Sequence, residues 1–198
     1  MRYETIVVGA SAGGIEALRI VLSSLPADFS MAVVIVLHIQ STIDGFLIDY
    51  LNSICEIPVK EADEKEKIMH GVVYIAPPNY HLLIEEDRTF SLSIDEHVNY
   101  ARPSIDVLFE TAAEVYNERL IGIVLTGGNR DGAFGLKRIE ESGGFAVIQD
   151  PETAIADSMP QSAIAQCKTP RIVRIEEIGP LLIALSGSFS DYTCKALR

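Results

Sequence analysis

Short apolar segments alternate with amphipathic segments along most of this chain. The apolar segments are rich in valine and isoleucine and cover residues 5–9, 32–38, 72–76, 120–125 and 145–149. Continuous apolar runs of this length are typical of parallel strands that are buried on both faces. Helical spacing of apolar residues predicts helices at 15–25, 46–54, 104–117, 131–142, 159–166 and 175–185. A short extended piece is expected at 171–174.

One segment departs from this alternation. Residues 81–85 and 89–94 flank the polar tip Glu86-Asp87-Arg88, which predicts an antiparallel hairpin. Strands that alternate with helices indicate an α/β fold. We therefore expect a doubly wound, mostly parallel sheet with helices on both faces and an antiparallel hairpin. The 198 residues, 1–198, are expected to form a single domain.

Charge and composition narrow the classes of function. The chain has 28 acidic and 16 basic residues, and its formal net charge of −12 disfavours binding to nucleic acid or to an anionic membrane. No apolar run approaches the ~20 residues of a membrane span, so we expect no membrane insertion. Cys55, Cys167 and Cys194 show neither disulfide nor zinc spacing, which favours buried thiols in a reducing, cytoplasmic compartment. The four histidines show no metal-ligand spacing, and we expect no metal and no cofactor.

Three reactive side chains follow three of the predicted strands. Ser11 lies in the segment GASAG, residues 9–13, between a strand and a helix, which matches the G-x-S-x-G nucleophile elbow. His38 ends the second apolar run, and Asp131 follows the run at 120–125. Each residue alone also has a structural interpretation: a helix-capping serine, a half-buried core histidine, and an aspartate that satisfies free N–H groups at a helix start.

Together the three side chains favour a catalytic relay. The carboxyl ends of parallel strands meet at the edge where α/β sheets bind ligands. Serine is a weak nucleophile unless an imidazole accepts its proton and a carboxylate fixes the imidazole tautomer. A second glycine-rich turn, residues 127–130, follows a strand at the same edge. Its backbone would supply an N–H group that completes an oxyanion hole with that of Ala12.

A nucleotide site is the disfavoured alternative. Residues 9–14 read GASAGG, which places Ser11 where the dinucleotide fingerprint requires glycine. Asp28, the acidic residue near the expected distance, comes before the second strand rather than at its end. The chain also lacks the Gly-Lys-Ser/Thr of a P-loop.

Several longer motifs occur in a consistent order. They read VGASAGG at 8–14, GVVYIAP at 71–77, ARPSIDVLF at 101–109, LTG at 125–127, DGA at 131–133 and QDPETA at 149–154, followed by Met159-Pro160. From about residue 6 to residue 185 the chain thereby resembles the catalytic domain of the CheB family, the chemotaxis receptor methylesterases. The resemblance implies a doubly wound α/β fold and hydrolysis of glutamate γ-methyl esters on chemoreceptor cytoplasmic helices, with release of methanol. Deamidation of receptor glutamines is a second activity that it implies.

The resemblance also implies roles for individual residues. Ser11 would be the nucleophile, His38 the general base and Asp131 the orienting carboxylate. The oxyanion donors would be the backbone N–H groups of Ala12 and Gly128. Further residues are expected to line the substrate site: Arg102, Arg130 and Met159. The implied substrate is a methylated chemoreceptor cytoplasmic domain, and other chemotaxis signalling proteins are candidate partners.

The chain departs from the family pattern in ways that leave an alternative open. Gly128-Asn129 stand where the family usually has Met-Gly, and His38-Ile39-Gln40 replaces His-Met-Pro. Because the first strand begins near residue 5, we expect no receiver domain, which typical members carry ahead of the catalytic domain. The alternative hypothesis is a catalytically weak or inactive CheB-like scaffold in a signalling complex. Reactivity of Ser11 toward a serine-directed organophosphonate would distinguish the two, and release of ammonia rather than methanol would identify a deamidase.

Overall fold

The computed structural model describes residues 3–38 and 44–187, so Cys194, Ile39 and Gln40 lie outside the described residues. Within this part of the chain, one sheet has seven strands: β1 (Thr5–Ala10), β2 (Ala32–Leu37), β3 (Val59–Glu61), β4 (Val73–Ile75), β7 (Leu120–Val124), β8 (Phe145–Gln149) and β9 (Arg171–Val173). All its pairings are parallel, in the order β3-β4-β2-β1-β7-β8-β9. The chain therefore winds outward from β1 in both directions.

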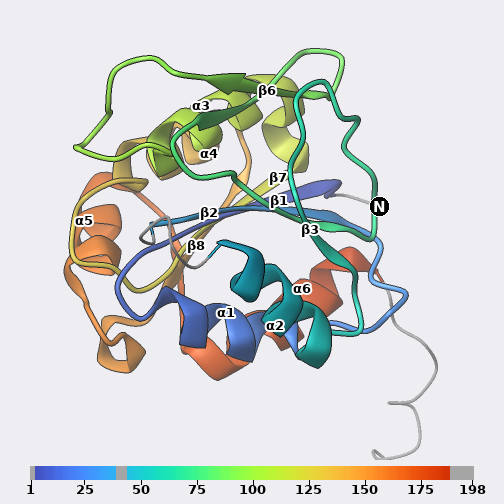
Figure 1. Ribbon diagram of the computed structural model, residues 1–198. Helices are drawn as coiled ribbons and strands as arrows, with labels where there is room; N and C mark the ends of the chain where they lie inside the picture. Colours follow the sequence, from blue (N-terminus) through green and yellow to red (C-terminus); the bar gives the residue numbers. More distant parts are fainter. Residues whose placement is uncertain (1–2, 39–43, 188–198) are drawn as a thin grey trace, which may run out of the picture.

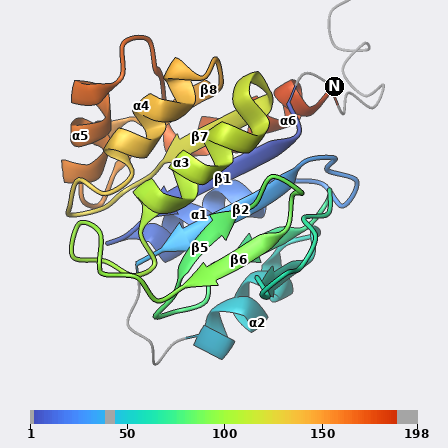
Figure 2. The same ribbon diagram turned by 90° about the horizontal axis from the view of Figure 1, so that it is seen from above.

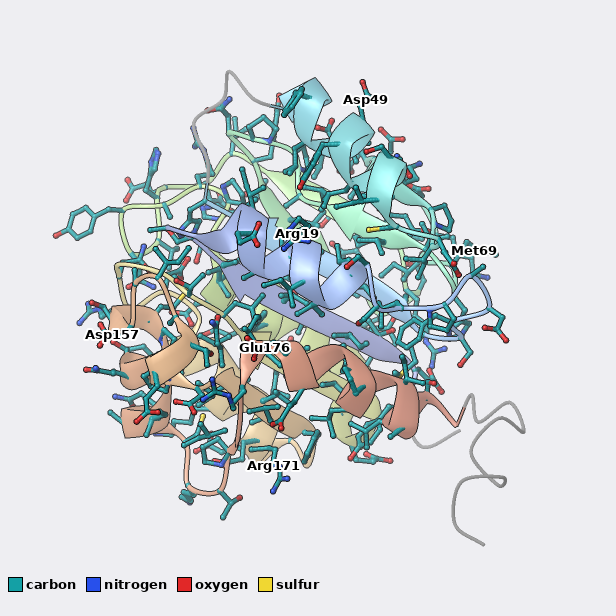
Figure 3. The ribbon with its side chains drawn as sticks, turned by 90° about the horizontal axis from the view of Figure 1, so that it is seen from below. Arg19, Asp49, Met69, Asp157, Arg171 and Glu176 are labelled. Carbon is teal, nitrogen blue, oxygen red and sulfur yellow. The ribbon has the colours of Figure 1, made fainter. Side chains whose placement is uncertain are left out.

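Helices cover both faces of this sheet (Figure 1). One face carries α1 (Gly14–Leu22), α2 (Asp44–Ile54) and α6 (Ile175–Ser186). The other carries α3 (Ile105–Tyr116) and α4 (Ala133–Glu141), with α5 (Ser158–Gln166) packed beside α4 (Figure 2). Seen from below, α1 with Arg19 and α6 with Glu176 lie side by side (Figure 3). Two short 3-10 helices, Asn117–Arg119 and Pro151–Thr153, complete the helical segments of the described residues.

The predicted hairpin is also present. Strands β5 (His81–Ile84) and β6 (Phe90–Ser93) pair antiparallel and pack beside α3 on the same side of the main sheet (Figure 2). The doubly wound, mostly parallel fold with an antiparallel hairpin is thus confirmed.

The central strands are buried on both faces, as their continuous apolar sequences predict. In β1, Ile6 and Val8 pack into the core beneath α1 and α6, whereas Val7 packs into the core beneath α3 and α4. Every residue of β1 and β2 is buried. Because side chains alternate along a strand, a sheet between two helical layers needs apolar residues at consecutive positions.

Some element boundaries differ from the predicted ones. Strand β3 was not predicted, because its three residues Val59–Glu61 are too few and too polar to show a strand pattern. Helix α4 begins at Ala133 rather than at 131, since Gly132 precedes it in the left-handed conformation, at φ 90°. Ser104 takes the predicted N-cap position of α3, but its hydroxyl does not cap that helix.

The described residues include two of the three cysteines and all the helices that can be tested as membrane spans. Cys55 and Cys167 are half-buried and form no disulfide. Burial raises the pKa of the Cys167 thiol to about 12, which leaves it protonated at neutral pH. Among the described helices, none has the length and apolar character needed to cross a membrane.

Candidate active site

Ser11 and His38 line one cavity at the carboxyl ends of β1 and β2. The cavity has a volume of about 400 Å³, and Asn129 and Arg102 also line it. Ala10 and Leu37 are partners in the parallel register, so the next residues, Ser11 and His38, leave the sheet side by side. The His38 N–H donates to the Ala10 carbonyl at 3.0 Å, which fixes the end of β2 against the start of the serine turn.

Glycines make the serine turn possible. A Cβ atom at Gly9 would overlap the side chain of Ile105, the first residue of α3. Gly13 has φ 80°, and a Cβ there would lie 2.7 Å from Cβ of Ile155. The first glycine of G-x-S-x-G therefore allows α3 to approach the sheet, and the second allows the turn into α1. A larger residue at either position would disturb the turn that carries Ser11.

Asp131 lies behind the His38 imidazole. Its Oδ2 atom is 3.1 Å from Nε2 of His38, and the Asp131 side chain is 0% exposed, compared with 14% for His38. Nε2 and Oδ2 are therefore close enough for an electrostatic contact, but their alignment is not that of an ideal hydrogen bond. A carboxylate beside Nε2 favours the tautomer with its proton on that atom, which leaves the lone pair on Nδ1.

The Asp131 carboxylate is held by the first turn of α3. Oδ2 accepts from the N–H of Ile105 at 2.7 Å, and Oδ1 accepts from the N–H of Asp106 at 3.2 Å and from the Ser104 hydroxyl at 2.9 Å. Burial alone would raise the pKa of Asp131, but these hydrogen bonds and His38 hold it below the ordinary aspartate value. The buried carboxylate therefore stays ionised at neutral pH.

Two asparagines that sequence reasoning did not assign to the site contact this pair. Asn129 accepts from the Asp131 N–H at 3.1 Å through Oδ1, and its Nδ2 atom lies 3.4 Å from Nδ1 of His38. Asn99 donates from Nδ2 to Oδ1 of Asp131 at 2.9 Å and to Oδ2 of Asp106 at 2.8 Å. Asn129 had been noted only as a departure from the family pattern. No local motif marks Asn99, because its partners lie 7 and 32 residues away.

The two glycine-rich turns at the cavity are tied together by Thr126. Its carbonyl accepts from the Ser11 N–H at 2.9 Å, and its hydroxyl donates to the Ala12 carbonyl at 2.8 Å. Gly128 is exposed, and a Cβ there would have no neighbour within 4 Å. The predicted oxyanion donors, Ala12 and Gly128, thus belong to two turns that Thr126 joins.

The three residues expected to line the substrate site have different surroundings. Arg102 lines the cavity, and its Nη1 atom donates to the carbonyls of Ile94 at 2.7 Å and Asp95 at 3.0 Å. Arg130 is exposed and is not among the residues that line the cavity. Met159 is fully buried in the core, where a Cβ on Gly127 would come within 2.5 Å of its Cε atom. Its contact with the site is therefore indirect, through the turn above it.

The described side chains also bear on metal binding. Within residues 3–38 and 44–187, no group of three or more His, Cys, Asp or Glu side chains is placed to hold a metal ion.

Comparison with known proteins places the chain in a family. The family model described as CheB methylesterase matches residues 6–182. A protein of Leptospira interrogans, named provisionally as a protein-glutamate methylesterase/protein-glutamine glutaminase, is 56% identical over 93% of this chain and 96% of its own length. A protein-glutamate methylesterase/protein-glutamine glutaminase 1 of Cupriavidus metallidurans is 38% identical over 93% of this chain, which spans 52% of that longer protein. The crystal structure of the Thermotoga maritima CheB methylesterase catalytic domain superposes with a TM-score of 0.87 at 31% identity, covering 93% of this chain and 100% of that domain. The chain belongs to the CheB methylesterase family.

Proposed function

We propose that this chain is a serine hydrolase that demethylates glutamate methyl esters on the cytoplasmic helices of chemoreceptors. The observation that carries the proposal is the placement of Ser11 and His38 in one cavity, with the ionised Asp131 buried behind the imidazole. The names of the relatives in Leptospira and Cupriavidus support the substrate class. Such a substrate places the chain in the cytoplasm, and other chemotaxis signalling proteins are candidate partners.

The proposed reaction has two steps. In the first, Ser11 Oγ attacks the ester carbonyl carbon while Nδ1 of His38, the nitrogen not facing Asp131, accepts the hydroxyl proton. The backbone N–H groups of Ala12 and Gly128 stabilise the oxyanion that forms. The C–O bond to the methoxy group then breaks, and His38 returns the proton so that methanol leaves. In the second step, water attacks the acyl-serine by the same route and releases a glutamate side chain.

The same site supports a second activity, deamidation of glutamine. Attack of Ser11 on a side-chain amide gives the same acyl-serine intermediate, with ammonia as the leaving group in place of methanol. The names of the relatives pair the two activities. Measuring ammonia release from an unmethylated receptor fragment that contains glutamine tests this activity separately.

The test is methanol release from a methylated chemoreceptor cytoplasmic fragment. The compared proteins are the wild type, Ser11→Ala and the control Ser53→Ala, whose exposed hydroxyl donates to the Tyr50 carbonyl of its own helix. We expect Ser11→Ala to lower turnover by at least about 10³-fold, because the nucleophile is lost. The control should match the wild type. Equal activity of Ser11→Ala and wild type would overturn the relay.

A wild type that releases no methanol would require a second measurement. Labelling with a serine-directed organophosphonate reports the reactivity of Ser11 without any receptor. A labelled Ser11 would support the assignment as a serine hydrolase and indicate that its substrate is a different ester. An unlabelled Ser11 in the folded protein would overturn the proposal and favour the scaffold alternative.

A further inference from the structure

Asn99 connects two buried carboxylates behind the cavity. Its Nδ2 atom donates to Oδ1 of Asp131 at 2.9 Å and to Oδ2 of Asp106 at 2.8 Å. Both aspartates are buried, and ionised carboxylates only accept hydrogen bonds. The two N–H bonds of this one amide therefore satisfy one oxygen on each carboxylate. Only the NH₂ end of an amide donates, so Nδ2 rather than Oδ1 lies between the two carboxylates.

The two carboxylates need a donor between them. The pKa of Asp106 is raised to about 6, because burial and the negative charge of Asp131 together outweigh the hydrogen bonds from the Gly135 N–H and Asn99. Like charges in a poorly solvated region repel, and the Asp131 carboxylate can relieve the repulsion by turning away from Asp106. Such a rotation would move Oδ2 of Asp131 relative to His38. The Asn99 amide, fixed between the two carboxylates, adds to the α3 donors that oppose this rotation.

The backbone around Asn99 holds its side chain in this position. Val98 and Ala101 exchange backbone hydrogen bonds at 3.2 and 2.9 Å across Asn99 and Tyr100. Asn99 and Tyr100 have φ of 50° and 64°, the pattern of a tight turn with two left-handed residues, in which asparagine is favoured. Tyr100 is fully exposed, whereas Asn99 is half-buried with its amide on the two aspartates. The turn thus accounts for an asparagine here but not for the two contacts of its amide.

We propose that Asn99 is a positioning residue of the relay, whose amide holds the Asp131 carboxylate against His38 and separates it from Asp106. This role rests on the proposed function of Ser11, His38 and Asp131. Asn99 itself does not line the cavity. Its loss should therefore reduce activation of the nucleophile and leave substrate binding unchanged.

Two substitutions separate this role from that of a turn residue. Asn99→Gly keeps a residue that tolerates positive φ but removes the amide. Asn99→Asp keeps the shape and the turn preference but replaces the donor with a third acceptor. A turn-forming role predicts that both variants resemble the wild type. The positioning role predicts that both are impaired, with aspartate the worse.

The matched control is Asn117→Gly. Asn117 also has φ 50° and is exposed, and its Nδ2 atom donates to the carbonyl of Glu114 in the preceding helix. The same substitution at a second asparagine of positive φ therefore removes an amide that is remote from Asp131. Thermal unfolding of each variant shows which of them are folded. If Asn99→Asp does not fold, Asn99→Gly still decides the question.

The experiment measures the rate constant for organophosphonate labelling of Ser11, together with kcat and KM for methanol release. We expect Asn99→Gly to lower the labelling rate and kcat by about 10- to 100-fold with little change in KM, since a hydrogen bond to a charged group is lost. Asn117→Gly should match the wild type. Labelling of both Asn99 variants within twofold of the wild type would overturn the positioning role alone. An unlabelled wild type would overturn the proposed function and, with it, this role.

Discussion

Replacement of Asp131 by asparagine tests the relay and the fold together. The Asp131→Asn variant keeps the side-chain size but turns one acceptor oxygen into an NH₂ donor. Oδ1 accepts from three donors, which belong to Asn99, Ser104 and Asp106. The amide oxygen of the variant therefore takes the Oδ1 position. The new NH₂ group takes the Oδ2 position, where it faces the Ile105 N–H and Nε2 of His38.

This geometry predicts two effects, one on the free energy of unfolding and one on kcat. The buried Ile105 N–H loses its acceptor at 2.7 Å, and a buried unsatisfied donor next to a lost charge costs about 2–4 kcal/mol of unfolding free energy. The NH₂ group also prefers an unprotonated Nε2, so the neutral His38 carries its proton on Nδ1. That nitrogen can then no longer accept the Ser11 proton, and we expect kcat to fall by about 10⁴-fold.

The assay combines urea unfolding with methanol release, using Asp87→Asn as the control. Asp87 is an exposed residue between β5 and β6, and it accepts hydrogen bonds from Thr89. The control should leave kcat and the unfolding free energy close to those of the wild type. A folded Asp131→Asn protein that keeps kcat within tenfold of the wild type would refute the assigned tautomer and the role of Asp131.

Further predictions concern stability and the resting state of the site. The pKa of Asp106 in the folded protein is about 6, above the ordinary value of 3.8. The folded state therefore binds this proton more tightly than the unfolded state. As the pH falls from about 6 to about 4, this group should raise the free energy of unfolding by about 3 kcal/mol at most. Asp106→Asn should lack this component, and an unchanged pH dependence of unfolding would contradict the assignment. Gly9→Ala should cost about 1–3 kcal/mol in urea unfolding, because the new methyl group overlaps Ile105; a neutral result would show that α3 can shift without cost. Asn129→Gly should raise the organophosphonate labelling rate of Ser11 about two- to fivefold, because Nδ2 of Asn129 then no longer competes for Nδ1 of His38. A lower rate would show that this amide assists the relay.

The arrangement of the sheet could be predicted because its strands are buried on both faces. Such strands are apolar at every position, and this signal is strong in short segments such as Ala32–Leu37. Edge strands carry no such signal. Val59–Glu61 pairs on one side only, with β4, and its lysine and glutamate are half-buried, so the pattern there is indistinguishable from a loop.

The cavity residues could be predicted for a similar reason, but their supporting contacts could not. Parallel strands place their carboxyl ends at one edge, which brings Ser11, His38 and Asp131 together from positions far apart in the chain. The expected lining residue Met159 shows the limit of this reasoning. A conspicuous motif position can lie beneath a turn, in the core, instead of on the cavity wall. Whether a side chain points up or down from a turn depends on packing that periodicity does not encode.

Asp131 combines a structural role with the catalytic role that we propose for it, and both depend on the same contacts. Its carboxylate does satisfy free N–H groups at a helix start, but they belong to α3, not to the helix that follows it in the chain. Together with His38, those N–H groups hold the pKa of the buried carboxylate below its ordinary value and keep it ionised. The helix start supplies the donors, and the carboxylate supplies the charge that fixes the imidazole. A substitution at Asp131 should therefore change stability and turnover together, whereas Asn99→Gly, which leaves the α3 donors to Asp131 in place, should change mainly turnover.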